Sequence, residues 1–278
     1  MREEGCTIYN KVMKLQTIVD IEKVPFSINA RHRVLLTGSC FADNIGHRLQ
    51  EDMLQATVNP HGVMYNPASV MHSVERTLGD GSCSQVDIAI MTLGTNHVYI
   101  LNETGEIVDN CLKRPQALFT EQKLTVEECG QYLRQTISML KAQNAETKVI
   151  LTVSPIRYAK YGFHESQLSK ATLLMAVEQV TNDMDVSYFP AYEIMNDELR
   201  DYRFYAPDML HPSAQAVEYI YEKFKNTYFA QDALRMAEEW QPIKRALGHK
   251  PFNADSDEYR AFIAKAEKDK EAFIERWR

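Results

Sequence analysis

The strongest constraint on the fold is a repeated alternation of short apolar segments with helical patterns. The segment 33–37 is rich in β-forming residues and precedes Gly38, and residues 41–50 then carry apolar side chains at helical spacing. Similar strand-like segments follow at 53–58, 86–93, 148–153 and 186–189, with helical patterns starting at 66, 125 and 166 between them. This alternation predicts an α/β fold, a three-layer α/β/α sandwich with a mostly parallel, flavodoxin-like five-stranded sheet.

Two parts of the chain depart from the alternation. Residues 98–124 show hairpin-like patterning and are expected to form an excursion from the core sheet. From Ser213 onward the chain is predicted to be helical, and Asp255 with Glu258 is predicted to cap a last helix. We therefore expect a main domain over 13–228 and a helical extension over 229–278 that packs on the same domain. The extension is expected to pack through an apolar stripe of Tyr259, Phe262, Ile263, Ala266, Phe273, Ile274 and Trp277.

Charge and composition exclude several classes of function. The 278 residues carry a formal net charge of -7, which leaves no general basic field for a nucleic acid backbone. No stretch is long and apolar enough to predict a membrane span. None of the eight histidines forms a His-x-x-x-His pair, and no glycine-rich loop of the dinucleotide or Walker type follows a strand. We therefore predict no metal, no cofactor, no nucleic acid partner and no membrane partner, and we leave the oligomeric state open.

The cysteines and the N-terminus predict a location. The five cysteines are scattered and odd in number, and they lack the paired spacing of a zinc site. A reducing compartment fits this pattern, and the first residues lack the apolar core of a signal peptide, so we expect a cytoplasmic protein. Residues 1–12, which precede Met13, are interpreted as a disordered leader or an artefact of start-site choice.

The candidate chemistry lies in the loops that follow the predicted strands. In an open parallel sheet these loops converge beyond the carboxyl ends of the strands, where ligands bind. Ser39 follows the first strand and is the candidate nucleophile, and Asp208 with His211 lies beyond the fifth. The three-residue spacing lets the carboxylate of Asp208 orient the imidazole of His211 as a general base. The alternatives are that Ser39 only caps a helix and that Asp208 is a capping residue beside a surface histidine.

Other residues of the same loops are candidates for binding. The oxyanion of an acyl-transfer intermediate needs hydrogen-bond donors, for which we name the N–H groups of Ser39 and Gly62 and the side-chain amide of Asn96. Gly62 and Asn96 also suit left-handed turns. His97, Arg157 and Arg203 are candidate substrate-binding residues, although surface salt bridges are the simpler role for either arginine alone.

At this point the sequence resembles the SGNH hydrolase superfamily, whose four blocks contribute Ser, Gly, Asn and His in that order. Ser39, Gly62, Asn96 and His211 follow the same order, and the phrase 38–42, Gly-Ser-Cys-Phe-Ala, resembles the GSCFA family within that superfamily. The resemblance implies an esterase, lipase or acyltransferase. The first block usually reads Gly-Asp-Ser, so one register places Ser39 at the nucleophile position and a register shifted by one places Cys40 there. We favour Ser39 because the strand leads directly to it.

The predicted function is that of a serine hydrolase. Its substrate is expected to be a small acyl ester, such as an O-acetyl group on a carbohydrate. Two alternatives stay open on the same fold: an acyltransferase, and a non-hydrolytic module that binds carbohydrate or a partner subunit.

Overall fold

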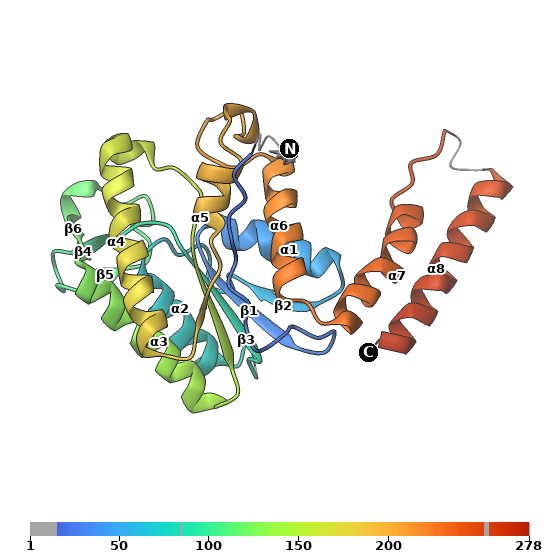
Figure 1. The fold of residues 1–278 in the computed structure, drawn as a ribbon, viewed down its shortest axis with the longest axis horizontal. Coiled ribbons are helices and arrows are strands. Elements are labelled where there is room, and N and C mark those ends of the chain that lie inside the picture. The colour runs from blue at the N-terminus through green and yellow to red at the C-terminus, as the bar shows by residue number, and fades with distance from the viewer. Residues whose placement is uncertain (1–15, 84, 253–255, 278) are drawn as a thin grey trace, which may run out of the picture.

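The computed structural model describes residues 16–83, 85–252 and 256–277 (Figure 1). The predicted leader at 1–12 and the predicted capping residue Asp255 lie outside these residues.

Five parallel strands form the central sheet. They are β1 (Arg33–Gly38), β2 (Gln55–Val58), β3 (Ile88–Leu93), β7 (Lys148–Val153) and β8 (Ser187–Tyr188). Their order is β2-β1-β3-β7-β8, and each neighbouring pair is parallel. This is the flavodoxin-like order. The chain adds β2 on one side of β1 and the later strands on the other side, so the strand order reverses between β1 and β3. The predicted fold class is confirmed, and the five strands lie within the predicted segments apart from the inclusion of Gly38 in β1.

Helices cover both faces of the sheet (Figure 1). The helices α1 (Cys40–Glu51) and α6 (Ala214–Tyr228) lie on one face, and α2 (Pro67–Asp80), α3 (Val126–Gln143) and α4 (Gly162–Asp183) lie on the other. Side chains alternate along each strand. Val34 and Leu36 therefore enter the core on the side of α1 and α6, while Leu35 enters the core on the side of α2, α3 and α4. The central strands β1, β3 and β7 are therefore buried on both faces, whereas the edge strands β2 and β8 are partly exposed.

Two of the predicted helix starts, at 66 and 125, are visible as caps, whereas α4 begins at Gly162 and not at the predicted 166. Asn66 caps α2, with Pro67 in its first turn. Thr125 and Glu128 form a complete capping box at the start of α3. These local signals place the helix starts correctly because a cap satisfies backbone N–H groups within one turn of the chain.

The excursion between β3 and α3 forms a separate small sheet. It contains β4 (His97–Leu101), β5 (Ile107–Val108) and β6 (Phe119–Lys123) in the antiparallel order β5-β4-β6. Later in the chain, the one-turn helix α5 (Ala191–Glu193) follows β8, and a π-helical turn over Ile194–Glu198 follows α5.

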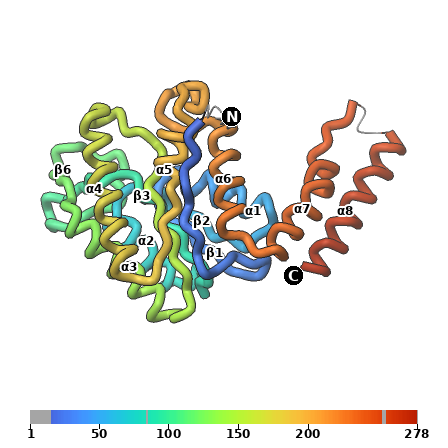
Figure 2. The backbone as a smooth tube through the Cα atoms, in the orientation of Figure 1, coloured from blue at the N-terminus to red at the C-terminus, as the bar shows by residue number. Residues whose placement is uncertain are grey.

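The C-terminal helices α7 (Gln231–Leu247) and α8 (Asp257–Trp277) form an antiparallel pair beside α6 and α1 (Figure 2). Ala233, Met236 and Trp240 of α7 join the core between α1, α6 and the sheet. Of the predicted apolar stripe of α8, Ala266 and Phe273 are buried, whereas Phe262 is exposed. The ring of Phe273 lies 5.1 Å from that of Trp240. In the described residues, no helix combines the length and the apolar character that crossing a membrane requires.

Candidate active site

The turn between β1 and α1 begins at a glycine that packing requires. Gly38 has φ +140°, and a Cβ at this position would lie 2.1 Å from the carbonyl oxygen of Thr92 on β3. The close approach of β1 and β3 therefore excludes any side chain here. The N–H of Gly38 donates to Oδ1 of Asn59, and its carbonyl accepts from the N–H of Met64, which joins the loop after β2 to the same turn.

Ser39 is the N-cap of α1 and is only 1% exposed. Its Oγ accepts from the N–H of Phe41 at 3.3 Å and lies 3.0 Å from Oγ1 of Thr92. Its own N–H donates to the carbonyl of Thr92 at 3.0 Å. The capping role that the sequence offered as an alternative is therefore present, and the catalytic role stays a prediction.

Cys40 is the first residue of α1 and is a half-buried free thiol. Its Sγ lies 3.7 Å from Oη of Tyr65. Tyr65 packs edge-to-face on Tyr158, with 5.8 Å between the ring centroids. The two adjacent candidates for the nucleophile thus differ, since the side chain of Ser39 is enclosed and that of Cys40 reaches toward a tyrosine cluster.

Asp208 and His211 form a local pair. Oδ2 of Asp208 lies 2.6 Å from Nδ1 of His211, and Oδ1 of Asp208 accepts from the N–H groups of Leu210 and His211 at 2.9 and 3.0 Å. These two backbone donors, and then the imidazole, lower the pKa of Asp208 to about 2, so this residue is a carboxylate at neutral pH. The arrangement orients the ring through Nδ1 and leaves Nε2 without a partner in the described part of the chain.

Arg157 holds the loop that carries Asp208 and His211, here called the His211 loop, beside the end of β7. Its N–H donates to the carbonyl of Leu210 at 3.0 Å, and its Nη1 donates to the carbonyl of Met209 at 3.1 Å. Its guanidinium also lies over the rings of Phe163 and Tyr205. Arg157 therefore supports the His211 loop, and its predicted role in binding substrate stays a prediction.

The three predicted oxyanion donors are already bonded to carbonyl groups. The N–H of Ser39 donates to Thr92, that of Gly62 donates to Asn59 at 2.8 Å, and Nδ2 of Asn96 donates to Leu124 at 2.7 Å. An oxyanion would have to displace the acceptors of Ser39 and Gly62 in this conformation, whereas Nδ2 of Asn96 has a second N–H to offer. The buried Oδ1 of Asn96 has no partner among the described residues.

His97 and Arg203 lie in different surroundings. His97 is buried, its Nδ1 lies 2.7 Å from Oε1 of Glu121, and its ring stacks on Tyr161 with 3.8 Å between the centroids. Arg203 is largely exposed and pairs with Asp201 at 3.4 Å. Neither side chain contacts the Asp208–His211 pair within the described residues.

A buried lysine hydrogen-bonds to the loops after β3 and β7, and the sequence alone did not identify it. Nζ of Lys170 on α4 donates to the carbonyls of Gly94 and Ser154 at 2.6 and 2.7 Å. The neighbouring Ser169 accepts from the N–H of Asn96 at 2.9 Å. Burial lowers the pKa of Lys170 to about 7. The sequence signal was a lysine on the apolar face of a helix, but long lysine side chains usually reach solvent from such positions.

Hydrogen bonds connect the loops that follow the strands at the carboxyl edge of the sheet, here called the rim loops. The loop after β2 bonds to Gly38, the N–H of Gly94 donates to Tyr65 at 2.8 Å, and the N–H of Ser154 donates to the end of β3 at 2.8 Å. Arg157 then continues the connection to the His211 loop. Among the described residues, neither Ser39 nor Cys40 hydrogen-bonds to His211. In the same part of the chain, no group of three or more His, Cys, Asp and Glu side chains could hold a metal ion.

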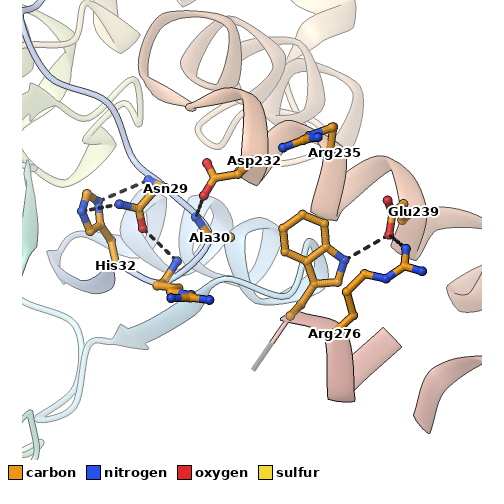
Figure 3. Close-up of a pocket in the computed structure, with 9 residues that line it drawn as sticks. Asn29, Ala30, His32, Asp232, Arg235, Glu239 and Arg276 are labelled. Atoms are coloured by element: carbon orange, nitrogen blue, oxygen red, sulfur yellow. Dashed lines mark hydrogen bonds and ion pairs between the residues drawn. The ribbon is translucent and has the colours of Figure 1, made fainter. Parts of the chain in front are cut away.

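Two cavities of similar size lie in different places. One of about 550 Å³ borders Arg157 and Tyr205 beside the His211 loop, and it continues along 192–202. The other, of about 710 Å³, lies before the start of β1, between Asn29, Asp232 and Arg276 (Figure 3). The N–H of Ala30 there donates to Asp232, and Glu239 accepts from Arg276 at 3.0 Å. This second cavity lies at the amino end of the strands, away from the rim loops.

A family model described as the GSCFA family matches residues 33–88 and 80–224, which is more than half of the chain. The chain belongs to the GSCFA family. A second model, described as the C-terminal domain of GSCFA domain proteins, matches residues 240–277. No curated protein is similar enough to this GSCFA protein to be matched with it.

Solved structures of esterases are similar to this chain at low sequence identity. A catalytic mutant of Axe2, an acetylxylan esterase from Geobacillus stearothermophilus, is 12% identical with a TM-score of 0.50, over 73% of this chain and 96% of that one. A carbohydrate esterase family 3 protein from Talaromyces cellulolyticus is also 12% identical, with a TM-score of 0.42 over 75% and 99% of the two chains. The fold of this GSCFA protein is therefore the α/β fold that Axe2 has.

Proposed function

We propose that this GSCFA protein is an acyl-ester hydrolase. One observation carries the proposal: the Asp208–His211 pair, with 2.6 Å between Oδ2 and Nδ1, is held beside the carboxyl edge of the sheet by Arg157. The turn after β1 ends at the same edge, at the point between β1 and β3 where such sheets bind ligands. Membership of the family and the SGNH fold support the same function.

The proposed mechanism divides the work between the rim loops. A nucleophile from the turn at Ser39 and Cys40 attacks the ester carbonyl, and Nε2 of His211 accepts its proton. Asp208 keeps the imidazole in one tautomer and stabilises the imidazolium. The sequence assigned the attack to Ser39 and the oxyanion contacts to the N–H groups of Ser39 and Gly62 and the amide of Asn96, and these assignments stay proposals.

The proposed substrate is a small acyl ester, such as an O-acetyl group on a carbohydrate. The cavity of about 550 Å³ beside Arg157 and the His211 loop is large enough for a sugar unit. The structural neighbour Axe2 acts on acetylxylan, which makes acetylated xylo-oligosaccharides a rational first substrate to assay. Arg203 lies outside the residues that line this cavity, whereas Arg157 lines it.

The test is hydrolysis of a chromogenic acetyl ester by the full chain and by His211→Ala. We expect turnover in the wild type and a loss of at least about a hundredfold in kcat for His211→Ala, because general base catalysis is worth that much. Arg31→Ala, at the amino end of the strands, serves as a control for handling and stability. Equal activity of the wild type and His211→Ala would contradict the proposal.

A second candidate is a non-hydrolytic binding module, favoured by the bonded state of all three predicted oxyanion donors. A module of this kind would bind an acetylated oligosaccharide and leave it intact. Calorimetric titration with acetylated xylo-oligosaccharide, followed by mass analysis of the sugar, separates the two. Intact sugar after binding supports the module, loss of acetyl groups supports the hydrolase, and transfer of the acetyl group to an added sugar supports an acyltransferase.

We also propose a reducing, cytoplasmic location. The four cysteines in the described residues, Cys40, Cys83, Cys111 and Cys129, are all free thiols. Free cysteines persist in reducing compartments.

A further inference from the structure

We infer that Cys40, and not Ser39, is the nucleophile of the site. The inference rests on the proposed function, because it names the atom that attacks the ester. Four observations carry it: the bonded state of Ser39, the free N–H of Cys40, the hydroxyl of Tyr65 beside its thiol, and a series of contacts through Tyr158 and Arg157 to the His211 loop.

Ser39 is occupied on both of its polar groups. Its Oγ caps α1 through Phe41 and bonds to Thr92, and its N–H bonds to the carbonyl of Thr92. Ser39 is 1% exposed, so Oγ cannot meet a carbonyl carbon unless the turn moves and the bond to Thr92 breaks. The pairing of Gly38 with Thr92 at the end of these strands holds Ser39 in this position.

The thiol and the N–H of Cys40 are available, unlike the polar groups of Ser39. Cys40 is half-buried, and its N–H has no hydrogen-bond partner in the described part of the chain. As the first residue of a 12-residue helix, it lies where free N–H groups and the helix dipole favour negative charge. The same N–H can bind the oxyanion of a carbonyl attacked by Sγ.

A pair of tyrosines packs beside this thiol. Oη of Tyr65 is 3.7 Å from Sγ of Cys40, and the ring of Tyr65 packs on that of Tyr158. Oη of Tyr158 is buried and unpartnered among the described residues, and it lies 3.0 Å from the position that a Cβ on Gly94 would occupy. Burial raises the pKa of Tyr158, so its hydroxyl stays protonated and can donate to a bound carbonyl.

Tyr65 and Tyr158 are also connected to the loop that carries the general base, His211. Tyr158 follows Arg157, whose N–H donates to the carbonyl of Leu210, the residue before His211. The thiol and the imidazole thus lie on loops connected through Tyr65, Tyr158 and Arg157. A cysteine beside a histidine is activated as a thiolate and imidazolium pair.

The reaction balances with water as the only co-reactant. The thiolate of Cys40 bonds to the carbonyl carbon, the ester C–O bond breaks, and the alcohol leaves with a proton from the imidazolium of His211. A water molecule then gives its proton to His211 and its hydroxide to the thioester. The C–S bond then breaks, which releases the carboxylic acid and restores the thiolate and the imidazolium; the released acid loses its proton to solvent afterwards.

Alkylation tests the inference without an ester substrate. Iodoacetamide labelling at pH 7, read by peptide mass spectrometry, compares Cys40 with Cys111, which is also half-buried. We expect Cys40 to react at least about tenfold faster, because a thiolate is the reactive form. We also expect His211→Ala to remove most of that difference. Equal rates for the two cysteines, or a rate at Cys40 that His211→Ala leaves unchanged, would overturn the inference.

Kinetics test the same assignment in turnover. We expect Cys40→Ala and Cys40→Ser to lose at least about a hundredfold in kcat on the acetyl ester. We expect Ser39→Gly, which removes the hydroxyl and keeps a residue tolerated at helix caps, to retain at least about a tenth of the wild-type kcat. Thermal melts confirm that each variant is folded. Loss of turnover in Ser39→Gly with survival in Cys40→Ala, together with phosphonate labelling of Ser39, would overturn the inference.

The outcomes also separate the two proposals. If the wild type hydrolyses the ester and the Cys40 variants do so equally well, the inference fails and the proposed function stands. If the wild type hydrolyses nothing and Cys40 still reacts rapidly with iodoacetamide in a His211-dependent manner, the proposed ester hydrolysis fails and the activated thiol stands.

Discussion

Asp208 shows how much of a candidate site can lie within a few residues of the chain. Its two carboxylate oxygens serve two tasks, since Oδ1 accepts from two backbone N–H groups and Oδ2 holds His211. The backbone bonds fix the position of the carboxylate independently of the imidazole of His211. A change to the charge of Asp208 should therefore affect the imidazole more than the course of the loop.

We predict that Asp208→Asn lowers kcat on an acetyl ester by about a thousandfold, because an amide oriented toward Nδ1 favours the wrong tautomer and no longer stabilises the imidazolium. The measurement is kcat across pH 6 to 9, with the midpoint of thermal unfolding as the control for folding. Full activity across this range would show that Asp208 only caps the loop.

Lys170 is a residue whose protonation couples to folding. Its Nζ is buried with two carbonyl acceptors, and a neutral amine has two N–H groups to match them. Burial lowers the pKa from 10.5 to about 7 in the folded state. Between these two values the unfolded chain binds the proton and the folded chain does not, so this residue makes the free energy of unfolding rise with pH.

We predict that Lys170→Met removes this rise, which has a slope of up to about 1 kcal/mol per pH unit for one proton. The measurement is urea unfolding of the wild type and the variant at pH 7.5 and 9.5. The pH dependence of the wild type minus that of the variant isolates Lys170 from the other titrating groups. Identical pH dependence in the two proteins would contradict the assignment.

At the scale of elements, the start of α1 depends on one hydroxyl. Oγ of Ser39 accepts from the N–H of Phe41 and also bonds to Thr92, so it joins the helix to β3. Thr125 caps α3 through a local capping box alone. The cap of α1 therefore includes a tertiary contact with β3, whereas the cap of α3 is local.

We predict that Ser39→Ala lowers the free energy of unfolding by about 1 kcal/mol for the lost cap, and by more than Thr125→Ala does, because Thr92 also loses a buried partner. Ser39→Gly should cost less than Ser39→Ala. The measurement is the urea midpoint at constant m-value. A smaller effect for Ser39→Ala than for Thr125→Ala would show that the bond to Thr92 contributes nothing.

At the scale of the whole molecule, the two C-terminal helices have different relations to the core. Ala233, Met236 and Trp240 place α7 within the core of the sheet face that α1 and α6 cover. In α8, Ala266 and Phe273 are the buried residues among those described. We keep as a proposal that residues 13–228 form the hydrolase domain and that 229–278 pack on it as an extension.

We predict that Phe273→Ala releases α8 and leaves the rest of the molecule folded, since losing a buried phenylalanine costs about 3 kcal/mol and α8 has few other buried contacts. Hydrogen exchange read by mass spectrometry should show faster exchange in 257–277 and unchanged exchange in the strands. Ile274→Ala, at a half-buried neighbour, is the matched control. Faster exchange throughout the chain would instead show that α8 belongs to the same cooperative unit as the sheet.

The sequence by itself determined the elements and the parts of the site made by near neighbours. The strand segments, the caps at Asn66 and Thr125, and the Asp208–His211 pair were all predictable because period and short spacing control them within one or two turns of chain. The parallel sheet followed from the alternation of these elements.

Only the tertiary structure decided which polar groups are free. The N–H and Oγ of Ser39 are taken by Thr92, 53 positions away, and the amide of Asn96 is taken by the carbonyl of Leu124. Lys170 reaches the carbonyls of two strand ends that lie 76 and 16 positions from it. No local pattern encodes such pairings, because each donor meets its acceptor only after the sheet and α4 have packed, and burial then makes an unpaired group costly. The sequence could therefore name Ser39 and Cys40 as neighbours in one turn, while the packing of β1 against β3 determined which side chain is enclosed.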